Sequence, residues 1–231
     1  DAAFENAEGE ITDTGPLLVA YLNLQRGIQK LDAGQLEEAA VFFREAVARI
    51  PAYVVAKEHL AETLHLMGND SEAAAIYEEV VQLSDDPEFK HALAKLYQAS
   101  GRASEAAALE AQARQGYLDL VSKYPEAMYW HAAEFYLAIG DNKLALELLE
   151  KNAALRPNSA SFVALARAQL VNEDVAYAKR SIDKALEMPL VSATLFWTAA
   201  KIYDKGEALS QADAFRAEAR RLNPRIEAAD P

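Results

Sequence analysis

The 231-residue sequence is 52% hydrophobic, carries a net charge of −13, and contains nine glycines, eight prolines and no cysteine. This composition favours a helical protein with a sizeable core, and the missing cysteines exclude disulfides, iron–sulfur clusters, thiolate zinc sites and cysteine nucleophiles. The acidic charge disfavours nucleic acid and anionic membrane surfaces as partners, and no apolar run approaches the ~18 residues of a membrane span.

The first segment, residues 1–16, is predicted to be an acidic arm in solvent. It is rich in Asp and Glu and holds no lysine or arginine, a pattern typical of a poorly ordered terminus. Pro16 then suits the first turn of a helix. The start at Asp1 instead of Met leaves open whether a leader was removed or a longer chain was cut. Since both reducing and oxidising compartments contain cysteine-free proteins, the compartment stays open too.

From Pro16 onwards, one pattern recurs about every 34 residues. Each period contains two segments of helical apolar periodicity, a glycine between them, an alanine shortly after the glycine, and a proline at the end. The predicted array spans 17–224, with units at 17–53, 54–86, 87–125, 126–158, 159–190 and 191–224, followed by a C-terminal tail at 225–231.

Each unit is predicted to be a helical hairpin. Glycine ends the first helix because it takes the left-handed cap cheaply, and proline ends the second. Glu173 stands at the glycine position of the fifth unit, and the sixth unit is displaced by about one residue around Gly206. The third unit is longer, which predicts one helix at about 103–123 and a division into two sets of three units with a bend between them. Because a hairpin cannot bury its apolar face alone, neighbouring hairpins should stack into a superhelix.

The segment Gly34–Ala46 (GQLEEAAVFFREA) followed by Pro51 resembles the signature of the tetratricopeptide repeat family, and Gly68–Tyr77 (GNDSEAAAIY) repeats it. The resemblance extends over 17–224. It implies an all-α fold, namely a right-handed α–α superhelix or solenoid of about six helical hairpins. It also implies a scaffold that binds other proteins, although this fold serves many partners.

In the family that the sequence resembles, first-helix positions line a concave groove. Both tryptophans, Trp130 and Trp197, occupy the same one of these positions in their own repeats. The implied peptide-binding groove consists of Glu58, Glu62, His65, His91, Lys95, Trp130, Glu134, Val163, Arg167, Trp197 and Lys201. Two interpretations stay open: the tryptophans and charges are exposed anchors for a peptide, or the tryptophans are core and the charges form a salt-bridge ladder. Leu24 and Ile28 occupy the positions of the chaperone-binding lysine–asparagine clamp, so that specialised function is not expected.

The sequence shows no glycine-rich phosphate loop, no nucleophile elbow and no His-x-x-x-His pair. We therefore predict no enzyme, no catalytic residue, no metal and no cofactor. One alternative starts from Glu58, Glu62 and His65, which share a helical face. With His91 of the next unit they could hold zinc or manganese, whereas the plainer interpretation is a polar groove face.

The predicted function is a protein–protein interaction scaffold that binds a peptide or partner helix in the concave groove. Two alternatives stay open. The first is a self-assembling oligomerisation module that joins through the apolar start at 17–19 or through the unit after Pro189. The second is a small-ligand or metal-binding repeat protein. The expected partner is a protein or peptide, or a second copy of the chain in the self-assembly alternative, with neither nucleic acid nor membrane insertion.

Overall fold

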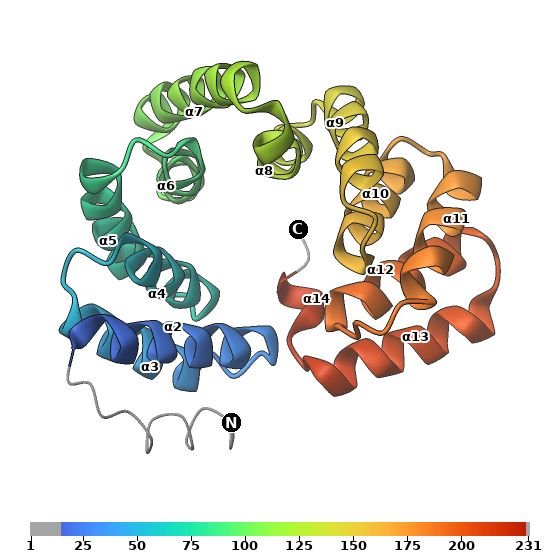
Figure 1. Cartoon of the computed structure of the whole chain (residues 1–231), viewed down its shortest axis with the longest axis horizontal. Helices are drawn as coiled ribbons and strands as arrows, with labels where there is room; N and C mark the ends of the chain where they lie inside the picture. The colour runs from blue at the N-terminus through green and yellow to red at the C-terminus, as the bar shows by residue number, and fades with distance from the viewer. Residues whose placement is uncertain (1–14, 230–231) are drawn as a thin grey trace. The chain divides into compact units, whose positions relative to one another are not determined.

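The structure, a computed structural model, describes residues 15–229 and is all-helical over that range (Figure 1). The predicted acidic arm lies outside the described residues except at its end, where Pro16 begins the first helix. The all-α repeat fold is confirmed, because twelve main helices follow one another in pairs with no strand between residues 15 and 229. None of the helices in this range is long and apolar enough to cross a bilayer.

Each predicted unit contains one pair of helices. The pairs are α2 (Pro16–Asp32) and α3 (Leu36–Arg49), α4 (Val54–Leu66) and α5 (Asp70–Leu83), α6 (Pro87–Ala99) and α7 (Ala103–Lys123), α8 (Pro125–Ala138) and α9 (Asn142–Leu155), α10 (Ser159–Val171) and α11 (Val175–Leu186), and α12 (Ala193–Lys205) and α13 (Leu209–Leu222). The residues predicted as a C-terminal tail contain a short helix, α14 (Ile226–Ala229), because Ile226 buries its side chain against α12 and α13.

The long helix predicted at about 103–123 is confirmed, since α7 runs from Ala103 to Lys123. The chain divides inside this helix into two compact units, Asp1–Arg114 and Gln115–Pro231. They are called the N-terminal unit and the C-terminal unit below. The division falls within the second helix of the third predicted hairpin, before the predicted boundary between the units 87–125 and 126–158.

The turns between paired helices take the left-handed conformation that the spacing predicts. The glycines of the first four units have φ between 71° and 82°. Glu173 adopts the same conformation in the fifth unit, with φ of 65°. In the sixth unit the prediction for Gly206 is wrong: its φ is −84°, and Glu207 carries the positive φ of 60° instead. The one-residue displacement seen in the sequence therefore moves the turn itself.

Small residues let the two helices of each pair approach closely. The alanine that follows each turn is buried in all six units, at Ala39, Ala73, Ala106, Ala145, Ala178 and Ala212. Gly27 has the same role in the first pair, because a Cβ at this position would collide with the ring of Phe43. Phe43 itself is fully buried and belongs to the core that runs from α2 to the start of α7.

Hydrogen bonds between buried side chains tie the C-terminal unit together in addition to apolar packing. Asn152 Nδ2 donates to Ser161 Oγ at 3.0 Å, which links α9 to α10. Ser181 Oγ donates to Gln169 Oε1 at 2.8 Å, which links α10 to α11. Because the buried polar groups are paired, they orient α10 without the cost of an unsatisfied donor. The helices that carry the candidate site are thus held in a defined register.

Candidate functional site

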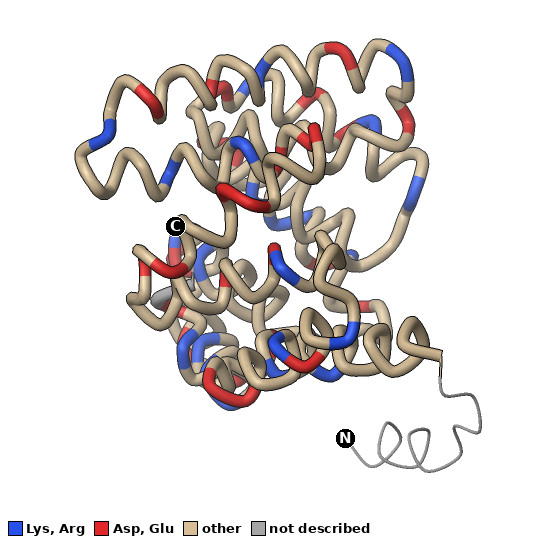
Figure 2. Tube along the Cα trace, turned by 90° about the vertical axis from the view of Figure 1, so that its left-hand side faces the viewer, with Lys and Arg blue, Asp and Glu red and all other residues tan. Residues whose placement is uncertain are grey.

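The predicted groove residues on the first helices of the N-terminal unit are acidic on α4 and of mixed charge on α6. Glu58 is largely buried, with 16% of its side chain exposed, whereas Glu62 is 46% exposed. On α6, His91 is half-buried and Lys95 is exposed. The predicted groove residues of this unit thus include both side chains that face solvent and side chains packed between helices. Figure 2 shows acidic and basic residues interspersed along the helices.

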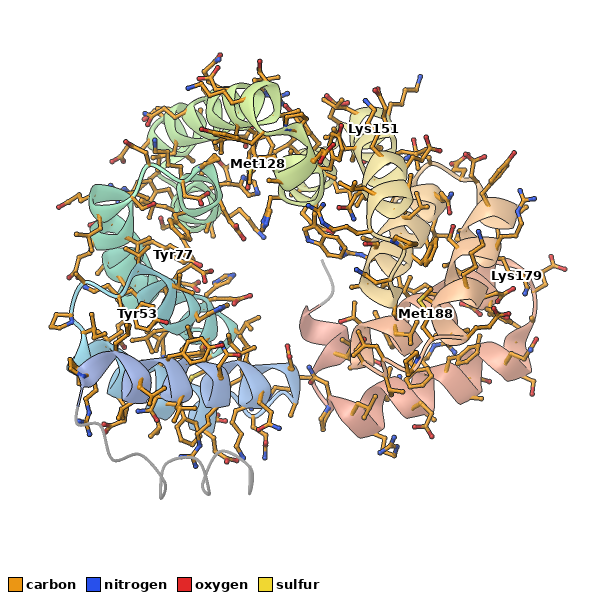
Figure 3. The ribbon with its side chains drawn as sticks, in the orientation of Figure 1. Tyr53, Tyr77, Met128, Lys151, Lys179 and Met188 are labelled. Carbon is orange, nitrogen blue, oxygen red and sulfur yellow. The ribbon has the colours of Figure 1, made fainter. Side chains whose placement is uncertain are left out.

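A Glu–His–Glu cluster forms on α4. His59 Nδ1 lies 3.3 Å from Glu58 Oε2 and 3.4 Å from Glu62 Oε2. The imidazole stacks on the Phe43 ring, with centroids 5.4 Å apart and planes at 19°. The other Glu58 oxygen, Oε1, accepts a hydrogen bond from the Tyr77 hydroxyl of α5 at 3.3 Å, and Figure 3 labels this tyrosine. Two neighbouring helices therefore hold the cluster in place.

The cluster carries more negative than positive charge. Burial raises the pKa of Glu58 to about 7, and the nearby charges of Glu62 and Glu88 add to this effect, while His59 opposes it. Burial also raises the pKa of Asp32, with help from Glu62. Burial by itself lowers the pKa of His59, but its hydrogen bond to Glu62 and the surrounding carboxylates outweigh burial and raise that pKa. A cation at this position would find favourable potential.

The structure corrects the set of possible metal ligands that was proposed from the sequence. His65 does not join Glu58 and Glu62; its Nδ1 lies 2.6 Å from Asp70 Oδ1, and both side chains are about half exposed. His65 lies in the last turn of α4, beside the start of α5, which explains the contact. The sequence signal that could have found His59 is its spacing of three from Glu62, one helical turn.

His91 provides the clearest pH-dependent contribution to stability. Burial lowers the pKa of His91 to about 4, and the charge of Lys95 adds to this, while Glu88 opposes it. The unfolded chain takes up the proton near the ordinary histidine pKa of about 6.5. The stability that comes from burying a neutral His91 is therefore fully present above that pH, and it is lost as the pH falls toward about 4.

We expect the His91→Asn variant not to show this fall in stability at acidic pH, because it has no imidazole to protonate. The stability of the wild type relative to the variant should fall by about 2 kcal/mol between pH 7.5 and pH 4.5. Urea unfolding at several pH values, followed by circular dichroism, measures the difference. Subtracting the variant removes the opposite contribution of Glu58, whose raised pKa acts in the same range. A constant difference across this range would show that folding leaves the pKa of His91 unchanged.

The first-helix row of the C-terminal unit contains an ion pair between neighbouring repeats. Arg167 Nη1 of α10 lies 3.4 Å from Glu134 Oε2 of α8, and these side chains are 31% and 33% exposed. This contact favours the ladder interpretation for this pair of charges. Trp130 is partly exposed and lies one turn before Glu134 on α8, and Lys201 of α12 is exposed.

Two of the predicted groove residues in this unit pack into the protein. Val163 is a correction to the predicted groove, because only 7% of it is exposed and it belongs to the core with Ile182 and Leu195. The reason is that α10 lies between neighbouring helices and buries most of its residues. Trp197 is partly buried and packs against the cluster of Ala193, Ala219 and Ile226.

Sequence reasoning missed a depression of about 440 Å³ between α5, α6 and the start of α7. Val81, Leu93 and Leu109 are among its lining residues, and Arg102 lies above the Tyr97 ring at 3.4 Å from its centroid. Arg102 also pairs with Glu78 at 3.2 Å and with Glu105. The charged side chains that line the depression are thus engaged with one another.

Residues 30–96 match a family model described as Tetratricopeptide repeat. Together with the helix pairs, the left-handed turns and the buried alanines, this match confirms the resemblance seen in the sequence. The chain thus resembles tetratricopeptide repeat proteins, with a match to the family model over residues 30–96 and the same paired-helix fold over the other described residues. Proteins with this fold are generally scaffolds for interactions between proteins. No curated protein sequence matches the chain.

Several solved structures share the fold at low sequence identity. A tetratricopeptide repeat protein from Parabacteroides merdae is 15% identical, with a TM-score of 0.59, covering 96% of this chain and 84% of that one. TTC0263, a thermophilic protein of this type from Thermus thermophilus, is 21% identical with a TM-score of 0.56, covering 84% and 98%. A chain of the APC/C hetero-tetramer Cut9–Hcn1 is 17% identical with a TM-score of 0.53, and the match covers 91% of this chain but only 42% of that longer chain.

Proposed function

We propose that the chain is a protein-interaction scaffold without catalytic activity of its own, which binds a peptide or a partner helix on the first-helix face of its C-terminal unit. The observation that carries the proposal is the partly exposed Trp130, which shares a helical face with the Glu134–Arg167 ion pair. An indole that is neither fully buried nor fully solvated offers a large apolar contact at little entropic cost. The ion pair beside it offers hydrogen-bond donors and acceptors to a peptide backbone.

The same face suggests the chemistry of the ligand. Val163 is buried and Trp197 packs against α13 and α14, so Trp130 is the aromatic anchor that this face offers. Arg167 pairs with Glu134, and Lys201 adds an exposed basic side chain to the same predicted row. This arrangement suits a peptide with one large apolar residue, with polar or acidic neighbours. It offers no continuous basic stripe of the kind that nucleic acid requires.

The experiment selects peptides from a random display library against the whole chain and then measures their affinity for variants. Trp130→Ala should weaken a selected peptide by about thirtyfold, because truncating an aromatic anchor costs about 2 kcal/mol or more. The matched control is Tyr177→Ala, which removes an exposed aromatic ring from the second helix α11 and should leave the affinity unchanged.

Two outcomes would contradict the proposal. One is a set of selected peptides whose affinity is the same for the wild type and for Trp130→Ala. The other is concentration-dependent self-association, measured by light scattering, that Leu17→Ser abolishes. Leu17 is 66% exposed on α2, so this second outcome would favour the self-assembly alternative.

A further inference from the structure

Three potential metal ligands lie within one turn of α4 in the N-terminal unit. One ligand atom each from Glu58, His59 and Glu62 can be chosen so that all lie within 4.8 Å of one another. The group combines an imidazole with two carboxylates and so differs from the surface clusters of acids that are common in acidic proteins. Imidazole and carboxylate together are a ligand set used for divalent transition metals.

Two of the three ligand separations fit the edges of a tetrahedral site, and the third, between Glu58 and Glu62, is no more than 4.8 Å. Zinc bonds to histidine nitrogen and carboxylate oxygen are about 2.0–2.2 Å long, which places neighbouring ligand atoms about 3.3–3.5 Å apart in a tetrahedron. His59 Nδ1 lies 3.3 Å from a Glu58 oxygen and 3.4 Å from a Glu62 oxygen. Both distances already match without movement of the helix.

Side chains of neighbouring helices also orient two of the ligands. The Tyr77 hydroxyl donates to the second Glu58 oxygen, and the Phe43 ring fixes the plane of the imidazole. Outer contacts of this kind orient metal ligands in proteins. Such support would be unnecessary for side chains that are simply solvated.

The charges around the three side chains favour a cation. Glu62 and Glu88 act on Glu58 with negative charge, and His59 acts on it with positive charge. Glu62 also acts on Asp32 of α2. A divalent ion would offset this excess.

We propose that Glu58, His59 and Glu62 form a binding site for a divalent transition-metal ion, with Zn²⁺ as the best match and a fourth position left to water. This site lies in the N-terminal unit and is separate from the peptide surface proposed around Trp130. Its test and the peptide test can therefore fail independently.

The experiment titrates Zn²⁺ into the whole chain by isothermal titration calorimetry and follows the melting temperature in parallel. The wild type should bind one ion per chain and melt at a higher temperature when Zn²⁺ is present. Tyr77→Phe keeps the ring but removes the hydroxyl that orients Glu58, and it should weaken binding by about 10–100-fold. Glu62→Gln removes a ligand from a half-exposed position, so it should fold normally and weaken binding at least as much.

The matched control is His65→Gln. It removes a histidine that also contacts a carboxylate on the same helix but lies outside the cluster, so Zn²⁺ affinity should not change. The proposal is overturned if the wild type shows neither binding heat nor a shift in melting temperature. It is equally overturned if Glu62→Gln binds as tightly as the wild type, or if His65→Gln loses as much affinity as Glu62→Gln.

Discussion

Replacing Phe43 with alanine is expected to lower the free energy of unfolding by about 3–5 kcal/mol, the range for a fully buried aromatic ring. Phe43 is 0% exposed and lies at the centre of the N-terminal core. Its ring occupies the space that Gly27 leaves free on α2 and stacks on His59 of α4. The loss should therefore loosen α2, α3 and α4 together, and urea unfolding followed by circular dichroism measures it.

Phe42 provides the matched control because it is the same residue type on the same helix. It is only partly buried and lies under Arg26, whose Cζ is 4.3 Å from the ring centroid. Phe42→Ala should cost clearly less than Phe43→Ala. Gly27→Ala should destabilise the wild type but be tolerated in the Phe43→Ala background, where helix propensity adds about 1 kcal/mol. Equal losses for both phenylalanines would refute this account of the core.

Trp197→Ala is expected to cost about 3 kcal/mol, the low end for tryptophan because the ring is partly exposed. Trp197 packs against Ala193, Ala219 and Ile226, so it joins α12 to α13 and to the short helix α14. Its removal should open a cavity under α14 and destabilise the C-terminal unit. Unfolding followed by far-ultraviolet circular dichroism measures the loss, because this signal does not depend on the tryptophan itself.

Trp130→Ala is the matched variant, since it makes the same substitution at the equivalent row position of α8. If Trp130 faces a ligand, its loss should cost less than half as much stability as that of Trp197. The difference separates the two interpretations that the sequence leaves open for these tryptophans. Equal and large losses would place both rings in the core and remove Trp130 as an anchor.

The hairpins could be predicted because their signals are local. A glycine or its substitute after each first helix, a buried alanine, and a closing proline each act within a few residues, so the pairing of α2 with α3 or of α12 with α13 follows from spacing alone. The length of α7 followed for the same reason, since nothing between Ala103 and Lys123 forces a turn. The shift from Gly206 to Glu207 shows the limit, because spacing locates a turn to within about one residue.

The candidate site was only partly predictable. Glu58 and Glu62 were placed correctly on one face of α4, but the histidine that joins them is His59 and not His65. The position of Val163 in its repeat predicted that it lines the groove, yet the packing of α10 between its neighbours buries it. Trp197 shared a row with Trp130, yet the chain after Pro224 forms α14 and contributes Ile226 to the cluster around it.

The sequence by itself determined the fold class, the six hairpins and the family resemblance, because helix caps, breakers and apolar periodicity depend on residues close together along the chain. Only the tertiary structure decided which polar side chains meet and which row positions remain exposed. The Glu134–Arg167 pair and the contact of Tyr77 with Glu58 join residues on different helices. Such contacts depend on the rotation and spacing of neighbouring helices, and counting residues along a single helix gives no information about either.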